Sequence, residues 1–399
     1  MPELNRRKFL IASVGAIGLA SGAAVTVPML MHQAEQRPLA AHKGILVVVT
    51  LYGGNDGINT VIPYADNAYH DARPELAFAP GEALDIDGHV GLNPALSGLK
   101  AMWDDKHLAI VRGVGYPKQD RSHFRSMDIW QSASPESPIG TGWIGRWLDA
   151  TGDDPLRAIN IGAVLPPMAV GEKHLAAGLS ANIPLLPAHF ASTLTALGKS
   201  DAHDTPEMAS VRGTYRANAN TERTLSQFAG ATPPTDDQID PGKQLADDLA
   251  LVAKCIHARV PTQVYMVELG GFDTHADERG DHQHLLTALD DALAPFLRQM
   301  KTNSYGRNVT VMVYSEFGRR VRANASHGTD HGSSAPVFIA GPPVKGGFYG
   351  DEPSLTDLND GDLKTTTDFR DVYYELLTKS IGTDPEPVLG SGRRDIGFL

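Results

Sequence analysis

The sequence has a single cysteine, Cys255, among its 399 residues, so an intramolecular disulfide is excluded. Cys255 lies in an apolar helical pattern, which indicates a buried, unreactive thiol rather than a nucleophile. Basic residues are also scarce, because 35 lysines and arginines face 47 acidic residues, for a formal net charge of −12. Binding to nucleic acid requires a basic surface that neutralises phosphates, so nucleic acid is not an expected partner. Beyond the N-terminal segment the sequence also lacks internal repeats and low-complexity blocks.

The N-terminal segment has the pattern of an export signal. An Arg6-Arg7 pair precedes an uncharged run over residues 9–27. This order is typical of a twin-arginine (Tat) signal peptide, which directs a folded protein through the Tat translocase to the periplasm. An uncleaved membrane anchor is the alternative, but Gly and Ser in the run disfavour it, so a stable membrane protein after signal cleavage is not expected. Residues 1–41 are therefore interpreted as signal and linker, and residues 42–399 as one domain.

Apolar, β-prone runs alternate with helical patterns along this domain. Strands are predicted over residues 44–51, 107–114, 158–161, 264–269, 309–314 and 337–340. Helices are predicted over residues 93–103, 142–150, 243–259, 282–300 with an interruption at Pro295, and 369–381 with Asp368 as cap. Strands separated by helices indicate an α/β fold with a mostly parallel central sheet and helices on both faces. The less regular residues around 165–241 are interpreted as a helical or irregular cap insertion over the site.

Acidic and imidazole side chains follow two of the predicted strands. They are Asp273 and His275 after strand 264–269, and Glu316, His327, Asp330 and His331 after strand 309–314. Open α/β sheets build their sites on loops at strand ends, so the two sets indicate one shared metal site. Oxygen and imidazole ligands suit Zn best, with Mn, Mg or Ca as alternatives. The competing interpretation is two ordinary sheet-to-loop transitions whose polar residues cap helices.

Two further strand ends carry candidate groups. Asn55 and Asp56 follow the first strand, where Asp56 is either a metal ligand or a turn aspartate that binds its own backbone. Ser122 follows the second strand and is either the N-cap of the next helix or a nucleophilic hydroxyl favoured by the helix amides. Arg121 and Arg319 could hold an anionic group by bidentate contacts, with solvation at the surface as the alternative.

Five motifs follow the signal: LYGGNDGINTVIP, DRSHFRSMDIWQ, GGFDTHADE, YSEFGRRVRAN and GTDHGSSAPVFIAGP. With them the chain resembles the domain-of-unknown-function family 1501, exported bacterial proteins related to the alkaline phosphatase and sulfatase superfamily. The resemblance covers essentially everything after the signal. It implies an alkaline-phosphatase-like fold, one or two divalent metals, and a Ser or Thr nucleophile near a helix N-terminus.

The resemblance also implies roles for individual residues. Asp56, Asp273, His275, Glu316 and His331 resemble metal ligands of the superfamily, and Ser122 occupies the region of the nucleophile. Three departures are visible in the sequence, one of which is that Ser122 lacks a diagnostic flanking motif. Phe317 follows Glu316 where the superfamily usually has His, and the spacing from Asp273 to His275 is shorter than in phosphatases. One metal with an activated water therefore remains as compatible with the residues as a covalent seryl intermediate.

The predicted function is an exported, metal-dependent hydrolase of phosphate or sulfate esters. In this hypothesis Asp273, His275 and His331 hold the main ion, and Asp56 and Glu316 hold a second ion or orient the first. The catalytic groups are Ser122 with His123 or His327 as acid or base, and a small anionic ester contacts Asn55, Arg121, Arg319 and Asp330. The main alternative is a non-catalytic envelope protein that binds a glycan or a partner protein. A third interpretation is a structural envelope protein without a metal.

Overall fold

The computed structural model describes residue 25 and residues 27–162, 164–179 and 240–399. Within these residues the central sheet has nine strands, and all pairings are parallel except those of β10 with β5 and β9. The predicted mostly parallel sheet is therefore confirmed. In sheet order the strands are β11 (Gly347–Tyr349), β5 (Leu108–Gly115), β10 (Ala335–Ala340), β9 (Val309–Ser315), β1 (Ile45–Leu51), β8 (Val264–Leu269), β6 (Ala158–Ile161) and β7 (Ala177–Leu179), with β12 (Thr367–Asp368) also on β5.

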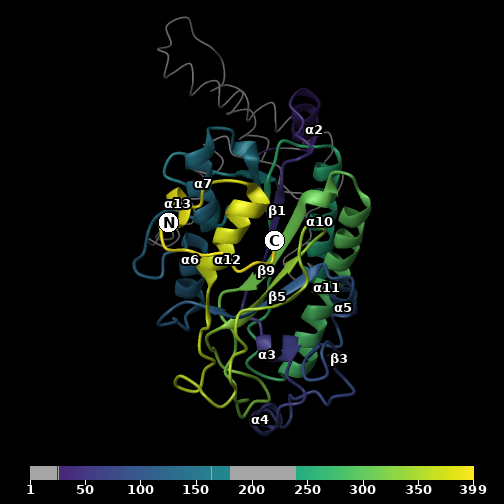
Figure 1. Ribbon diagram of the computed structural model, residues 1–399, viewed down its shortest axis with the longest axis vertical. Helices are drawn as coiled ribbons and strands as arrows, with labels where there is room; N and C mark the ends of the chain where they lie inside the picture. The colour runs from purple at the N-terminus through teal and green to yellow at the C-terminus, as the bar shows by residue number, and fades with distance from the viewer. Residues whose placement is uncertain (1–24, 26, 163, 180–239) are drawn as a thin grey trace, which may run out of the picture.

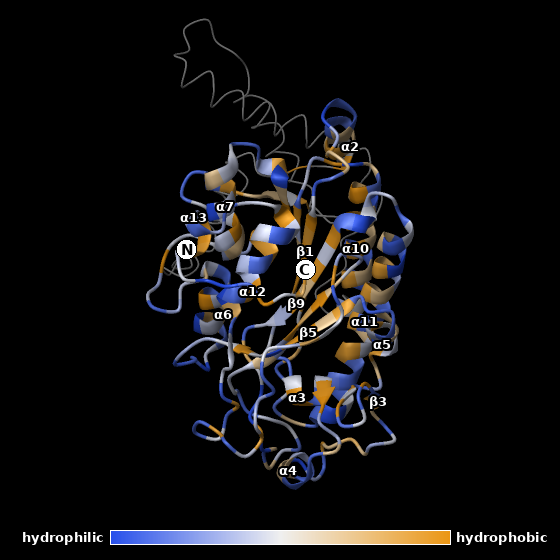
Figure 2. Cartoon of the chain, viewed as in Figure 1, coloured by the Kyte–Doolittle hydropathy of each residue, from blue (hydrophilic) through white to orange (hydrophobic). Residues whose placement is uncertain are grey.

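Strand β1 lies inside the sheet, and every one of its residues is buried. Val47 and Val49 belong to the core on one face of the sheet, and Leu46 and Val48 to the core on the other. Successive side chains of a strand point to opposite faces, so a strand that is covered on both sides must be apolar throughout. Figure 2 shows this arrangement as orange strands between helices that carry blue residues.

Helices lie on both faces of the sheet (Figure 1). One face is covered by α2 (Val27–Gln36), α5 (Ser97–Asp104), α10 (Pro241–His257) and α11 (Glu278–Thr302). The other is covered by α6 (His123–Ser132), α7 (Trp143–Thr151), α12 (Phe369–Glu375), the π-helical turn Leu376–Ile381 and α13 (Glu386–Leu389). On this second face Trp143 stacks on Tyr373 with ring centroids 4.3 Å apart. The predicted α/β class, with helices on both faces of the sheet, is confirmed.

A smaller unit follows the carboxyl end of β1. It consists of α3 (Gly57–Thr60), β2 (Val61–Ile62), α4 (Asn67–Ala72), β3 (Leu84–Asp85) and β4 (Gly91–Leu92), and the three strands form an antiparallel sheet in the order β2-β4-β3. Its own apolar cluster includes Ile62, Tyr69 and Phe78. Short 3-10 turns elsewhere span Pro155–Arg157, Pro167–Ala169 and Gly306–Asn308. None of the helices in the described ranges combines the length and apolarity that a bilayer crossing needs.

The fold differs from the sequence-based expectation in three segments. Residues 27–36, interpreted as linker, form α2, whose Leu30 is fully buried in the core. Helix α11 continues through Pro295, because its buried face, which includes Leu293 and Leu297, packs on the sheet and offsets the lost backbone hydrogen bond. Strand β7 pairs with β6, although its residues were assigned to the cap. The Arg6-Arg7 signal and residues 180–239 of the predicted cap lie outside the described residues.

Candidate metal centre

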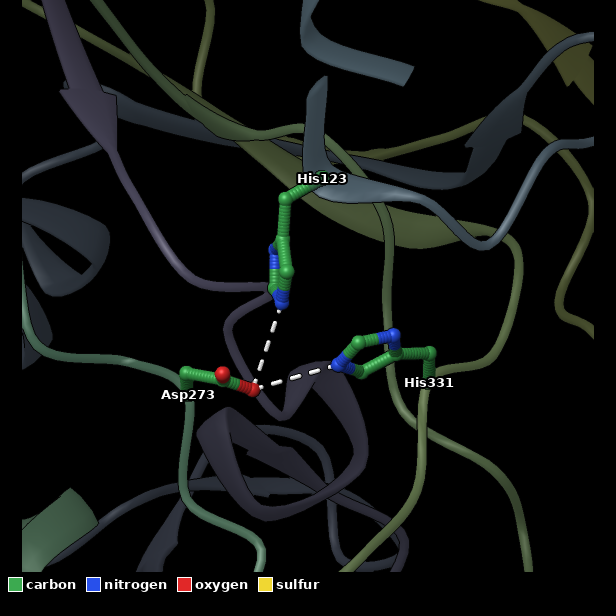
Figure 3. A group of neighbouring side chains, drawn as sticks. All are labelled: His123, Asp273 and His331. Carbon is green, nitrogen blue, oxygen red and sulfur yellow. Dashed lines mark hydrogen bonds and ion pairs between the residues drawn. The ribbon is translucent and has the colours of Figure 1, made fainter. Parts of the chain in front are cut away.

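Three imidazoles and one carboxylate converge at the carboxyl edge of the sheet. His123, Asp273 and His331 offer ligand atoms within 4.8 Å of one another (Figure 3). Oδ1 of Asp273 is the common point, at 3.3 Å from Nε2 of His123 and 3.2 Å from Nε2 of His331. His275 adds a third imidazole, whose Nε2 lies 3.0 Å from Oδ1 of Asp273 and 2.9 Å from Nε2 of His331. These four residues are called the metal cluster below.

The topology of the sheet brings the four residues together. Asp273 and His275 follow β8, His123 begins α6 after β5, and His331 lies between β9 and β10. Strands β5, β8 and β9 run in the same direction, so their carboxyl ends meet at one edge, where β10 begins. Sites in open α/β sheets form at this edge because the loops there diverge around a crevice.

His123 and His331 each have a hydrogen-bond acceptor at Nδ1. Nδ1 of His123 lies 2.8 Å from Oε1 of Glu316, and Nδ1 of His331 lies 2.8 Å from the carbonyl oxygen of Arg121. Nδ1 of His275 lies 3.5 Å from Oδ1 of Asp330. A carbonyl or carboxylate oxygen only accepts, so in His123 and His331 Nδ1 carries the hydrogen and Nε2 keeps its lone pair for the cluster.

The donor set fits a divalent cation. Nε2 of His123 is buried and makes no hydrogen bond to any described residue, although Asp273 is close to it. Nε2 of His275 and Nε2 of His331 face each other at 2.9 Å, and two lone pairs cannot bond to each other. A cation held by His123, Asp273 and His331 would satisfy the nitrogens of these two histidines. Imidazole nitrogens with one carboxylate are ligands that Zn²⁺ prefers.

Arg319 holds Asp273 in place. Its side chain is fully buried, and it donates to Oδ1 of Asp273 at 2.9 Å and to the carbonyl oxygens of Gly54, Phe272 and Thr329. Burial by itself raises the pKa of Asp273, but the hydrogen bond and the positive charge of Arg319 contribute to lowering it to about 2. In the structure Arg319 therefore binds and orients Asp273, whereas the sequence had suggested that Arg319 contacts the substrate.

Glu316 lies behind His123 instead of beside Asp273. Its buried carboxylate accepts from the Gly53 amide at 3.0 Å and from the Ser315 hydroxyl at 2.9 Å, in addition to His123. The neighbouring Phe317 ring packs on His123, with ring centroids 4.8 Å apart, and on His331, at 4.9 Å. His123, predicted as an acid or base, therefore lies between Glu316 and Asp273, and Glu316 orients this imidazole, which is one of the two roles that the sequence suggested for it.

Asp56 belongs to a second group, made of fully buried residues. Its Oδ2 is paired with Arg73 at 2.5 Å, and its Oδ1 accepts from the Ile58 amide at 3.3 Å, so it caps α3 as a turn aspartate does. Glu278 and His282 complete the group, with ligand atoms within 4.8 Å of those of Asp56. Burial and the Asp56 charge raise the pKa of Glu278 to about 9, so this carboxyl is protonated near neutral pH. The positive charge of Arg73 and the proton on Glu278 therefore already balance the negative charge of this group.

Asn55, also a predicted substrate contact, is hydrogen-bonded to His282 of the same buried group. Its side-chain carbonyl faces Nε2 of His282 at 2.8 Å, and its amide donates to Thr60 at 3.0 Å. Burial lowers the pKa of His282 to about 4, against the opposing effect of Asp56, so this imidazole is neutral. Sequence reasoning missed Arg73, Glu278 and His282. The four-residue spacing of Glu278 and His282 on a helix was the one available signal, since it places them on one face.

The other predicted site residues are spread around the metal cluster. Ser122 occupies the N-cap position of α6 and is exposed, and its hydroxyl makes no capping hydrogen bond to a described residue. The Arg121 guanidinium is paired with Asp360 and Asp362. Asp330 is exposed beside His275. His327 is exposed and pairs with Glu75, and it is not among the residues that contact Asp273.

The comparisons with known proteins give a family and a set of similar folds. The profile of a family described as "Protein of unknown function (DUF1501)" matches residues 187–394. No curated protein matches the chain. Among solved structures, an alkaline phosphatase superfamily protein from Vibrio parahaemolyticus is similar at 10% identity and a TM-score of 0.43, over 97% of this chain and 78% of that one.

Two other solved structures are similar at the same level. The C-terminal periplasmic domain of EcEptC from Escherichia coli, in complex with Zn, has 11% identity and a TM-score of 0.37, over 76% of each chain. A murine ectonucleotide pyrophosphatase/phosphodiesterase 5, inactive and in complex with AMP, has 10% identity and a TM-score of 0.38, over 89% of this chain and 97% of that one.

Proposed function

This chain belongs to the DUF1501 family, and since that description assigns no activity, we propose from its site that it is a metal-dependent hydrolase of phosphate or sulfate esters. One observation carries the proposal. Nε2 of His123, Nε2 of His331 and Oδ1 of Asp273 lie within 4.8 Å of one another at the carboxyl edge of the sheet, and both histidines have an acceptor at Nδ1. This combination is how proteins hold a divalent cation and fix its ligands.

The metal cluster would hold one ion, most suitably Zn²⁺. When bound, such an ion lowers the pKa of a coordinated water and polarises an ester oxygen. Asp56 and Glu316 both have other partners, which supports one ion rather than two. His331 would serve as a neutral ligand, because burial lowers its pKa and favours the neutral form.

An anionic ester is the substrate that the surroundings favour. His123 is the first residue of α6, so the free amides of that helix's first turn start at the metal cluster. Helix N-termini attract phosphate and sulfate oxygens through these amides and through the helix dipole. The exposed Ser122 hydroxyl precedes His123 directly and is available as nucleophile or as an anion-binding group.

The place of action in this proposal is the periplasm. The Arg6-Arg7 pair and the uncharged run after it support export through the Tat translocase, which carries folded proteins. A protein that takes up its metal before export would need such a route.

Metal content of the purified full-length chain tests the proposal, measured by plasma mass spectrometry beside Asp273→Ala, His331→Ala and the control His327→Ala. We expect roughly one equivalent of Zn²⁺ or another divalent ion in the wild type and the control, and none in the two cluster variants. Turnover of 4-nitrophenyl phosphate and 4-nitrophenyl sulfate should follow the metal. Wild-type turnover in Asp273→Ala would overturn the metal role, and metal without turnover would favour the non-catalytic alternative.

A further inference from the structure

The loop between β11 and β12 is bonded to two of the segments that deliver histidines to the metal cluster, those of His123 and His331. Asp362 is at the centre of this loop, and its side chain is 6% exposed. Oδ2 of Asp362 accepts from Nε of Arg121 at 2.9 Å and from its terminal nitrogen at 2.5 Å. Oδ1 accepts from Nε of Arg320 at 3.2 Å. One buried carboxylate therefore joins two arginines from different segments.

Both arginines lead directly to the metal cluster. The carbonyl oxygen of Arg121 is the acceptor for Nδ1 of His331 at 2.8 Å, and Arg121 is two residues before His123. The backbone amide of Arg320 donates to the carbonyl oxygen of Asp330 at 3.0 Å, next to His331. The position of the Arg121 backbone thus orients one imidazole and carries another.

The same loop holds the segment after His331 through its backbone. The Ser333 hydroxyl donates to the carbonyl oxygen of Leu363 at 2.5 Å, and the Ser334 hydroxyl donates to that of Lys364 at 3.3 Å. The loop therefore contacts the residues after His331 directly. It is linked to the residue before His331 through Arg320, and to His331 itself through Arg121.

Asp360 provides an internal comparison. It pairs with the same two arginines, at 3.0 Å from Arg121 and 3.5 Å from Arg320, but its side chain is 79% exposed. Exposed ion pairs contribute little because water and salt screen them, whereas a buried hydrogen-bonded carboxylate restricts its partners strongly. The two aspartates thus differ in burial and share their partners.

We propose that Asp362 is a positioning residue for the metal centre, which sets metal affinity by fixing Arg121. Its charge holds the Arg121 side chain, the Arg121 carbonyl holds Nδ1 of His331, and Nε2 of His331 is thereby aimed at Asp273. The inference rests on the proposed metal centre. Outer partners of metal-binding histidines commonly change metal affinity by about 10- to 100-fold when they are lost.

The test is the Zn²⁺ dissociation constant of the full chain, measured by competition with a chromogenic chelator. Asp362→Asn should weaken Zn²⁺ binding by about 10- to 100-fold, and the matched control Asp360→Asn by less than about 3-fold. Arg121→Gln should resemble Asp362→Asn. The double variant should bind no more weakly than either single variant, because both changes release the same carbonyl. Thermal unfolding of the metal-free forms reports any general loss of stability.

The outcomes separate this inference from the proposed function. A wild type that binds no divalent ion would remove the proposed metal centre. A wild type that binds Zn²⁺, with Asp362→Asn unchanged, would overturn only the role of Asp362. If the double variant weakens Zn²⁺ binding by the product of the two single effects, Asp362 acts independently of Arg121. That result would overturn the proposal that Asp362 acts through Arg121. Should Asp362→Asn fail to fold, Arg121→Gln decides, since its half-exposed side chain is replaceable and an unchanged dissociation constant would contradict the inference.

Discussion

Nδ1 of His123 lies 2.8 Å from Oε1 of Glu316, a carboxylate that is 1% exposed. His123 follows β5 and Glu316 follows β9, so the two residues come from segments that are far apart along the chain. The carboxylate holds the imidazole in one tautomer and makes its Nε2 a better electron donor to a cation. Glu316 thus contributes to the metal cluster through His123.

Glu316→Gln is expected to weaken Zn²⁺ binding by about 10- to 100-fold, because the amide loses the charge that orients His123. Glutamine keeps the size of the side chain, so the surrounding packing is preserved. Glu75→Gln is the control, since Glu75 pairs with the exposed His327 outside the metal cluster. Chelator competition measures both variants, and equal affinities for the two would refute the role of Glu316.

The metal-free protein should show His123 titrating above its usual pKa of 6.5. The hydrogen bond to Glu316 raises the pKa of His123, burial opposes the shift, and the Glu316 and Asp273 charges add to the increase. This pairing contributes stability that is fully present below the unfolded value of 6.5 and is lost as pH rises through the folded pKa. Proton NMR titration of the imidazole measures it. In Glu316→Gln the pKa of His123 should fall, and an unchanged titration curve would contradict this account.

Arg73→Met is expected to destabilise the fold by roughly 3–5 kcal/mol, because it leaves the buried Asp56 carboxylate without its partner. The lost hydrogen bonds to the carbonyls of Val321 and Arg320 add to the effect. Lys100→Met removes an exposed ion pair with Asp104 and should cost less than about 1 kcal/mol. Urea denaturation measures the free energy of unfolding of the two variants. A similar decrease in both would show that the buried ion pair contributes no more to stability than the exposed one.

Glu278→Gln should make stability less dependent on pH. The pKa of Glu278 is raised from 4.5 to about 9, by burial and by the Asp56 charge. Between these values the folded protein holds a proton that the unfolded chain has released, so the free energy of unfolding falls as pH rises. Glutamine has no proton to lose, and the decline should be shallower. Urea denaturation at several pH values in this interval measures the slope, with the exposed Glu82→Gln as control; a slope equal to that of the wild type would contradict the raised pKa.

The sequence alone determined the elements of the sheet and part of the metal cluster. The apolar run at residues 44–51 predicted a buried strand, which the structure confirms, and Asp368 caps α12 through the Arg370 amide as its side chain predicted. Asp273 and His275 were predicted together because residues two apart in an extended segment point the same way. These inferences needed only neighbouring residues.

Tertiary structure decided which strand-end residue meets which partner. Glu316 and His123 both follow strands at the same edge, and in the folded protein the imidazole faces Asp273 while the carboxylate lies behind it, with Phe317 packed on both His123 and His331. Asp56 looked like a ligand in sequence, but the fold brings Arg73 within 2.5 Å and neutralises it. Local sequence specifies where a side chain leaves the backbone, whereas its partner depends on contacts between segments that are far apart along the chain.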